Sequence, residues 1–179
     1  DISAAFPDLV EALGGRAVLD GELLVGHDFD PMNFNHLQQR LNRKKPAKSH
    51  ICHYPAFVRV YDMLFDGEED IRDLPLVDRR RRLEVWMATH AGTRLDLSEI
   101  LAFKDWDELA ALRRMGAETH GHEGLMIKQL QSLYVAGRPK GPWFKWKRDP
   151  RLIDTVMMYA QRGHGRRSSF YSDYTFGIW

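Results

Sequence analysis

Two runs of apolar residues along the chain have the length and composition of β-strands. Residues 17–25 (AVLDGELLV) and residues 56–65 (AFVRVYDMLF) are rich in side chains that favour strands. Turn-forming residues follow each run, with Gly26 and Pro31 after the first and Asp66-Gly67 after the second. The pattern therefore predicts two long strands that each end in a turn.

Three other segments repeat their apolar residues every three or four positions, which is typical of a helix with one buried face. These segments are residues 33–43, 75–90 and 105–115. Pro75 suits the first turn of the second helix. The apolar positions that predict the three buried faces are Phe34, Leu37 and Leu41, then Leu76, Leu83 and Met87, and finally Trp106, Leu109 and Leu112.

Shorter apolar runs predict further strands at residues 94–97, 123–130, 143–147, 152–160 and 172–179. Because strands and helices are mixed without strict alternation, we expect an α+β fold with a largely antiparallel sheet. The sequence Arg148-Asp149-Pro150 is the expected boundary between two domains, residues 1–149 and residues 150–179.

Composition narrows the class of protein. Hydrophobic residues make up 44% of the chain and charged residues 28%, which excludes a mainly disordered chain. No apolar run approaches the roughly 20 residues that a membrane span needs. The single cysteine, Cys52, cannot form an internal disulfide, which favours a reducing compartment.

The formal net charge of +1 hides an uneven distribution of charge. Residues 137–167 contain nine basic and two acidic residues with aromatic residues between them. Such a stretch either holds nucleic acid by charge and stacking or forms a solvated face of a sheet, and both alternatives stay open. Two shorter basic runs, residues 40–48 and 79–82, are expected to be exposed faces of helices.

Three short motifs contain the side chains of a nucleotide site. They are Asp20-Gly21-Glu22, Glu123-Gly124 and the pair Lys145 and Lys147. Each is common alone, but together they supply carboxylates that hold Mg²⁺ and lysines that neutralise a phosphate. Since residues two apart in a strand point to one face, the two lysines share a face and Phe144 and Trp146 share the other.

The ordered segments LDGELLV, RVYDMLFDG, EGLMIK and WFKWKRD resemble the successive motifs of bacterial ATP-dependent DNA ligases, which belong to the covalent nucleotidyltransferase superfamily. They agree with that family in order and spacing over residues 17–150. The following sequence, DTVMMYAQRGHGRRSSFYSDYTFGIW, resembles the first strands of the OB-fold that follows the adenylation domain. The resemblance implies part of a nucleotidyltransferase domain, with ATP-grasp-like antiparallel sheets and helices, followed by the start of an OB-fold β-barrel.

The resemblance also implies an activity and its cofactors. The family seals nicks in double-stranded DNA with ATP as the AMP donor and with Mg²⁺ or Mn²⁺, through enzyme-adenylate and DNA-adenylate intermediates. By this resemblance, Tyr61 stacks on adenine, Glu22 contacts the ribose or assists the metal, and Glu123 binds the metal. The phosphate contacts and catalytic roles fall to Lys145 and Lys147, with Lys128 as a further nucleotide contact.

Other implied roles lie near the end of the chain. Asp149 takes the position of the hinge between the two domains, and Arg162, Arg166 and Arg167 face the DNA backbone. The same resemblance implies a monomer in the bacterial cytoplasm, associated with the nucleoid.

The chain also departs from the family pattern. The nucleophilic lysine of the family lies in a Lys-x-Asp-Gly motif before the Asp-Gly-Glu strand, whereas the first lysine here is Lys44. We therefore expect the chain to be a piece of a longer protein and to be unable to form the lysyl-adenylate alone. An RNA ligase, an mRNA-capping guanylyltransferase and a non-catalytic nucleic-acid-binding module stay open as alternatives.

Overall fold

The structure is a computed structural model that describes residues 1–179 except 42, 91, 93, 120–121, 138 and 151. Two arginines of the basic stretch, Arg138 and Arg151, therefore lie outside the described residues. Within the described part, no helix is long and apolar enough to cross a membrane.

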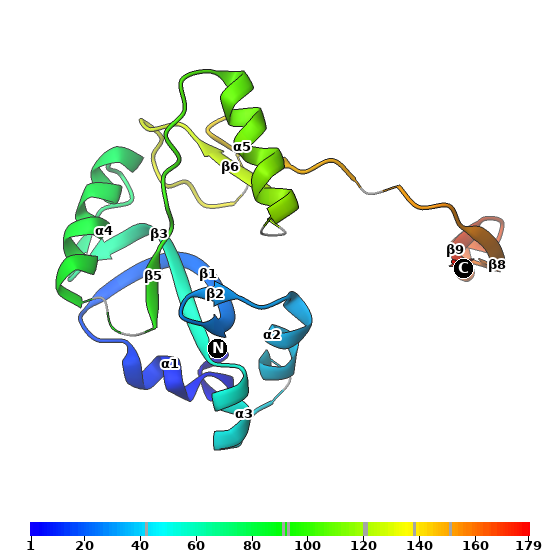
Figure 1. Cartoon of the computed structure of the whole chain (residues 1–179), viewed down its shortest axis with the longest axis horizontal. Coiled ribbons are helices and arrows are strands. Elements are labelled where there is room, and N and C mark those ends of the chain that lie inside the picture. The colour runs from blue at the N-terminus through cyan, green and yellow to red at the C-terminus, as the bar shows by residue number, and fades with distance from the viewer. Residues whose placement is uncertain (42, 91, 93, 120–121, 138, 151) are drawn as a thin grey trace.

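A long antiparallel strand pair forms the centre of the molecule (Figure 1). Strand β1 (Ala17–His27) pairs with β3 (Ala56–Asp66) from Ala17↔Asp66 to Val25↔Ala56. Strands β2 (Asp30–Pro31) and β4 (Glu69–Asp70) extend this sheet, and β5 (Leu95–Leu97) pairs parallel with β3. The prediction of an α+β fold with a largely antiparallel sheet is confirmed.

The β1–β3 ladder is irregular where the Asp-Gly-Glu motif lies. The register shifts between Asp20 and Gly21, so that Tyr61 has no partner between the pairs Gly21↔Val60 and Asp20↔Asp62. A Cβ atom on Gly21 would lie 2.8 Å from the Arg59 carbonyl oxygen, so glycine permits this close approach of the two backbones. The irregularity places Asp20 and Tyr61 side by side.

Helix α4 (Leu76–His90) packs on β3 and closes the main hydrophobic core. Its predicted apolar face is confirmed, because Leu76, Leu83 and Met87 are all buried. The core cluster consists of Val60, Met63, Ile71, Leu83, Trp86, Met87 and Leu95.

A second, smaller core lies at the other end of β1, among short helices. These are η1 (Ser3–Ala5), α1 (Pro7–Ala12), α2 (Phe34–Leu41) and α3 (Lys48–His53). The prediction for the buried face of residues 33–43 is wrong in part, since Phe34 is 63% exposed. Arg40 is fully buried instead, where it donates to the Ala5 carbonyl and the Asp8 carboxylate.

Both basic runs that were predicted as exposed helix faces contain a buried arginine. Arg40 and Arg79 have no exposed surface because each meets a carboxylate and backbone carbonyls inside the protein. Their guanidinium groups have enough partners to replace water, which the charge count of the runs does not reveal.

The remaining elements form two hairpins. Strands β6 (Gly124–Lys128) and β7 (Trp143–Lys147) are antiparallel and contact helix α5 (Trp106–Thr119). Trp106, predicted on the buried face of that helix, is 63% exposed. The second hairpin consists of β8 (Val156–Arg162), η2 (Gly165–Arg167) and β9 (Tyr171–Gly177).

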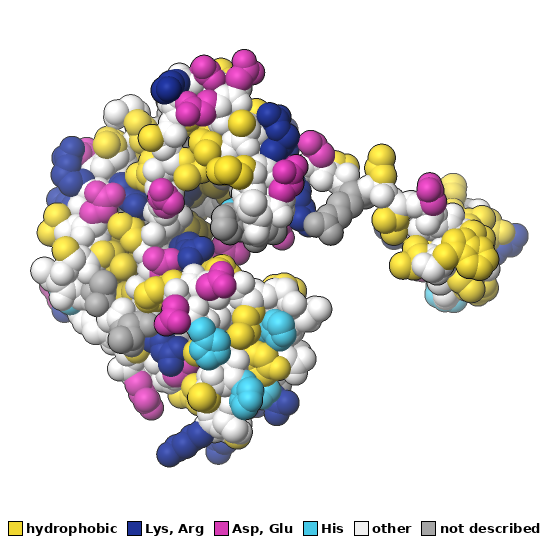
Figure 2. Space-filling view, viewed as in Figure 1, with side chains coloured by type: hydrophobic (Ala, Val, Ile, Leu, Met, Phe, Trp, Pro, Cys, Tyr) yellow, Lys and Arg dark blue, Asp and Glu magenta, His cyan; other side chains and the backbone are white. Residues whose placement is uncertain are grey.

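The β8–β9 hairpin lies apart from the other elements at the end of an extended segment (Figure 1). Hydrophobic side chains gather on its surface (Figure 2). Those at least half exposed include Val156, Met157, Met158, Tyr159, Tyr171, Tyr174 and Phe176.

Candidate functional site

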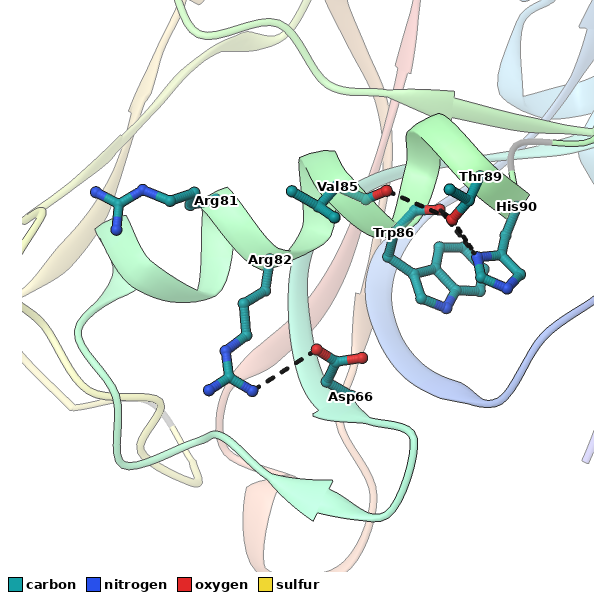
Figure 3. A pocket seen from close by; sticks show the side chains of 7 residues that line it. All are labelled: Asp66, Arg81, Arg82, Val85, Trp86, Thr89 and His90. Carbon is teal, nitrogen blue, oxygen red and sulfur yellow. Dashed lines mark hydrogen bonds and ion pairs between the residues drawn. The ribbon is translucent and has the colours of Figure 1, made fainter.

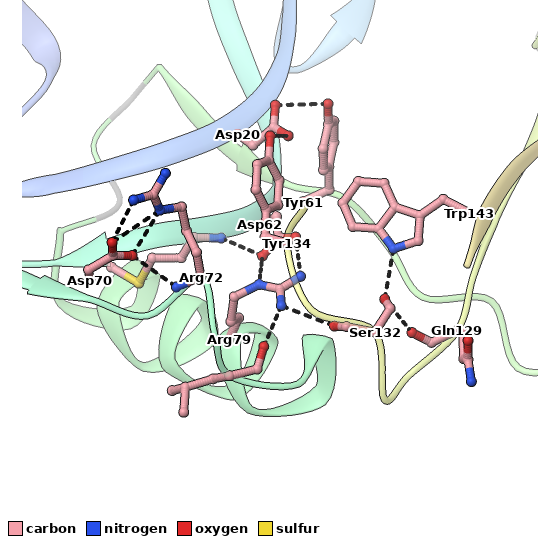
Figure 4. Close-up of polar contacts among 12 residues, drawn as sticks. Asp20, Tyr61, Asp62, Asp70, Arg72, Arg79, Gln129, Ser132, Tyr134 and Trp143 are labelled. Atoms are coloured by element: carbon pink, nitrogen blue, oxygen red, sulfur yellow. Dashed lines mark hydrogen bonds and ion pairs between the residues drawn. The ribbon is translucent and has the colours of Figure 1, made fainter. Parts of the chain in front are cut away.

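The carboxylate of Asp20 joins two tyrosines that come from distant parts of the chain (Figure 4). Tyr61 donates its hydroxyl to Asp20 Oδ1 at 3.0 Å, and Tyr134 donates to Asp20 Oδ2 at 2.8 Å. Burial and the negative charge of Asp20 raise the pKa of Tyr61 above its usual value and the pKa of Tyr134 to about 12. Both hydroxyls therefore stay protonated and keep the two rings in place.

A buried ion pair between Asp62 and Arg79 lies next to Asp20 and the two tyrosines. Arg79 Nε donates to Asp62 Oδ1 and Arg79 Nη2 to Asp62 Oδ2, both at 2.8 Å, and neither side chain is exposed. Arg79 Nη1 donates to the carbonyls of Leu74 and Ser132. One guanidinium group thus ties β3, helix α4 and the segment after β6 together, with ideal bidentate geometry.

The segment between β6 and β7 is fixed by a short chain of hydrogen bonds (Figure 4). Trp143 Nε1 donates to Ser132 Oγ at 2.8 Å, and Ser132 Oγ donates to the Gln129 carbonyl at 2.7 Å. The Tyr134 ring lies edge to face with the Trp143 ring, with centroids 5.7 Å apart. Trp143 is therefore held beside the two tyrosines.

The ammonium group of Lys128 lies among these rings. Lys128 Nζ is 4.0 Å from the centroid of the Tyr61 ring and 4.1 Å from that of Trp143. The nitrogen is buried and has no hydrogen-bond partner in the described part of the chain. Burial lowers the pKa of Lys128, although the charges of Asp62 and Asp20 oppose this shift.

The exposed side of the candidate site lies on the β6–β7 hairpin. Lys145 Nζ donates to Glu123 Oε2 at 2.7 Å, and both side chains are exposed. The Lys145 ammonium lowers the pKa of Glu123. Lys147, also exposed, lies directly opposite Gly124. Gly124 has φ +142° and a Cβ atom there would lie 2.2 Å from the Trp146 carbonyl oxygen, so only glycine fits.

The opposite face of this hairpin packs on helix α5. The guanidinium of Arg113 lies over the Trp146 ring at 4.9 Å from its centroid. Arg113 also donates to the Lys147 carbonyl and, at 3.2 Å, to Asp149 Oδ2. The predicted separation of the lysines from Trp146 is therefore confirmed, and Asp149 is tied to helix α5.

A separate hollow of about 340 Å³ is lined by residues of helix α4 and by Asp66 at the end of β3 (Figure 3). The Trp86 and His90 rings stack in it with centroids 4.7 Å apart. None of the sequence-predicted site residues lines this hollow. The other lining residues are Asp66, Arg81, Arg82, Val85 and Thr89.

With this geometry established, comparison with known proteins identifies the family. The family model described as "ATP dependent DNA ligase domain" matches residues 1–147. The chain belongs to this family. The resemblance stated from the sequence motifs is therefore confirmed, as is the nucleotidyltransferase type of fold.

Individual relatives of this ligase domain agree with the family model. A probable DNA ligase of Koribacter versatilis is 30% identical over 99% of the chain, and a DNA ligase of Thermococcus fumicolans is 32% identical over 94%. The chain spans about a third of the length of these relatives, 35% and 31% respectively. A solved structure of a Lig E DNA ligase matches 89% of the chain with a TM-score of 0.68 and 15% identity. The match covers 57% of the chain in that structure.

The ligase domain brings some of the predicted site residues together and leaves others apart. Tyr61 contacts Lys128, Glu123 contacts Lys145, and the exposed Glu22 is near enough to raise the pKa of Tyr61 together with burial and Asp20. By contrast, Arg162, Arg166 and Arg167 lie on the separate β8–η2–β9 hairpin (Figure 1).

Sequence reasoning missed several residues that organise the site. They are Asp20 and Tyr134, which share a hydrogen bond, Asp62 and Arg79, which form the buried ion pair, and Trp143, whose ring lies beside Lys128. Arg79 did have a signal in the sequence, because it falls on the same helix face as Leu76 and Leu83.

Proposed function

We propose that the protein to which this chain belongs seals nicks in duplex DNA through enzyme-adenylate and DNA-adenylate intermediates. The observation that supports this best is the Tyr61 ring, which is fixed by a hydrogen bond to Asp20 and contacts the Lys128 ammonium group over its face. A fixed aromatic face suits the stacking of a base, because stacking needs a flat surface in a defined position.

The exposed carboxylates supply the metal ligands of this proposal. In the described part of the chain, no three acidic, histidine or cysteine side chains gather to hold a metal ion by themselves. Mg²⁺ accepts one or two carboxylates and completes its shell with phosphate oxygens and water. Glu123 and Glu22 fit this use, since both are exposed and neither belongs to the buried network.

The lysines supply positive charge. Lys145 and Lys147 would contact the phosphates of ATP, with Lys128 near the base. When the metal is bound, it neutralises negative charge on the transferring phosphoryl group. The attacking lysine belongs to the Lys-x-Asp-Gly motif of the family, which does not occur among these 179 residues. That amine would bond to the α-phosphorus, lose its proton and displace pyrophosphate.

The last part of the chain would bind DNA. We assign residues 1–149 to the adenylation domain and residues 150–179 to the beginning of an OB-fold, with Asp149 at the hinge. Arg162, Arg166 and Arg167 would contact the phosphate backbone, which positions a protein on DNA without reading sequence.

The test uses the full-length protein, purified with its natural termini and incubated with labelled ATP, Mg²⁺ and nicked DNA. We expect a labelled lysyl-adenylate and sealed DNA, with both lost in the variants Glu123→Ala and Lys147→Ala. Sealing of nicked RNA in preference to DNA, or labelling by GTP in preference to ATP, would contradict the proposal. DNA binding that falls with salt and is indifferent to both variants would support a binding module instead.

A second arm tests the chain by itself. The 179-residue chain, incubated with labelled ATP and Mg²⁺, is expected to stay unlabelled. A stable covalent label on it would show that a lysine within residues 44–147 is the nucleophile.

A further inference from the structure

The position of Lys128 is unusual for a lysine. Its ammonium nitrogen is buried, within 4.1 Å of the centroids of two aromatic rings, and has no hydrogen-bond acceptor among the described residues. An ammonium group offers three donors and is strongly hydrated in water, so this burial is unfavourable unless other contacts offset it.

The contacts that hold Lys128 are the ring faces. In the β6–β7 ladder Lys128 lies directly opposite Trp143, so both side chains project from the same face of the hairpin. A desolvated cation over an aromatic face gains about 2 kcal/mol. The carboxylates near it are already engaged, Asp20 by Tyr61 and Tyr134, and Asp62 by Arg79.

This arrangement lets the ammonium leave easily. No hydrogen bond must break when Lys128 moves, and its four-carbon stem is flexible. The side chains of Tyr61 and Trp143, by contrast, are fixed by hydrogen bonds to Asp20 and Ser132. The walls therefore stay in place when their occupant departs.

The ring that Lys128 covers is the one that the proposed function needs. A base cannot stack on the enclosed face of Tyr61 while an ammonium group lies 4.0 Å from the ring centroid. We propose that Lys128 is an internal occupant of the base-binding slot, lying between the Tyr61 and Trp143 rings, and that it leaves the slot when the purine enters. This inference rests on the proposed function, because it concerns the same site.

One consequence is that Lys128 weakens nucleotide binding. The base must displace the cation before it stacks, and the free energy of that displacement is subtracted from the free energy of base binding. Lys128 thereby determines affinity for the base part of the ligand, whereas Lys145 acts on the phosphate part.

The first experiment separates base from phosphate in the full-length protein. The probes are adenosine, which has no phosphate, and AMP, with binding measured by calorimetry. The variant Lys128→Met keeps the length of the side chain and removes its charge. We expect it to bind adenosine and AMP more tightly, each by about 10-fold, and Lys128→Arg to bind both less tightly than Lys128→Met.

The matched control is Lys145→Met, which removes a lysine charge from the same face of the hairpin. It is expected to weaken the binding of AMP, while its affinity for adenosine stays close to that of the wild type. If Lys128→Met instead weakens AMP and leaves adenosine unchanged, Lys128 contacts phosphate. If it weakens both, Lys128 is a wall of the site. Either result would overturn the inference.

The second experiment needs no variant and therefore does not depend on how a variant folds. An amine-directed acetylating reagent is applied to the wild-type protein with and without adenosine, and acetylation of Lys128 is measured by peptide mass spectrometry. We expect low reactivity without adenosine and higher reactivity with it, because the displaced amine enters solvent. A protein that seals nicks but shows unchanged or lower reactivity of Lys128 with adenosine would overturn the inference and leave the proposed function standing.

Discussion

The two antiparallel strand pairs that hold the candidate site contain two contrasting groups of charged side chains. Along β1 and β3, the carboxylates of Asp20 and Asp62 are enclosed and each is bonded to specific partners. In the β6–β7 hairpin, Lys145 and Lys147 are exposed, as is Glu123 just before β6, whereas the Lys128 nitrogen at the end of β6 is buried. The first pair extends over eleven residues in each strand and the second over five.

This difference separates two tasks. Buried, fully bonded groups keep one geometry, which suits the fixed aromatic face of Tyr61. An exposed ion pair such as Glu123–Lys145 contributes about 0–1 kcal/mol, so its members exchange partners easily. The exposed half of the site, which consists of Glu123, Lys145 and Lys147, is therefore suited to groups that bind and leave, such as phosphates and metal ions.

The largest effect that tests this difference between buried and exposed charges is expected from removing Arg79. The variant Arg79→Met leaves the Asp62 carboxylate buried without its partner, and loss of one member of a buried pair costs about 3–5 kcal/mol. We expect the free energy of unfolding to fall by that amount in a urea titration followed by circular dichroism.

The matched control is Arg82→Met on the same helix. Arg82 pairs with Glu69 at 2.6 Å, but the two side chains are 35% and 60% exposed. Its loss should change the free energy of unfolding by about 1 kcal/mol or less. Equal effects of the two substitutions would show that burial of the Arg79–Asp62 pair has no special weight.

The second prediction concerns the backbone that positions the exposed half of the site. In the variant Gly124→Ala, the new Cβ atom meets the Trp146 carbonyl oxygen and must push the strand that contains Lys145 and Lys147 away. A displacement of about 1 Å of catalytic groups costs about 100-fold in rate, or 2.7 kcal/mol. We expect nick sealing by the full-length protein to fall by that factor.

Gly14→Ala is the control for this variant, because nothing lies within 4 Å of a Cβ atom at that position. Its sealing activity should equal that of the wild type. If Gly124→Ala also kept full activity, the exact register of the β6–β7 hairpin would have no influence on the reaction.

The same two halves show how much the sequence reveals. The exposed residues Glu22, Glu123, Lys145 and Lys147 lie in short motifs that the sequence alone reveals, and their roles in the site stay predictions. The long strands were predicted as well from the length and composition of their apolar runs, and helix α4 from its spaced residues Leu76, Leu83 and Met87. The order of β1 and β3 in the sheet follows from pairing that spans about 40 residues and was not predicted.

The buried arginines were missed for a physical reason. Arg40, Arg79 and Arg113 each lie on the apolar face of a helix, three or four residues from Leu37, Leu76 and Leu109 respectively. Helical spacing therefore signals that they point inward. Their carboxylate partners lie 17 to 36 residues away, and only the tertiary fold brings them together.

The third prediction concerns pH and the buried half. Burial alone would raise the pKa of Asp8, but the hydrogen bond from Arg40, the backbone N–H of Ala56 and the charge of Arg40 lower it overall. Because the folded pKa lies below the unfolded one, the stabilisation is present above the unfolded pKa of about 3.9 and is lost as pH falls through the folded value.

The variant Asp8→Asn should therefore lose about 2 kcal/mol of unfolding free energy at pH 7. The difference from the wild type should shrink as the pH is lowered below 4, measured by thermal unfolding at a series of pH values. A difference that stays constant with pH would mean that the charge of Asp8 does not stabilise the fold.

The smallest effect is expected for the ion pair of the exposed half, and it decides whether the two halves differ in kind. A double-mutant cycle with Glu123→Gln and Lys145→Met measures the coupling between the two side chains, which are 71% and 42% exposed. We expect a coupling below about 1 kcal/mol that decreases as salt is added. A larger, salt-independent coupling would mean that Glu123 and Lys145 are held as firmly as Asp62 and Arg79, and the exposed half could not exchange its partners for phosphate and metal.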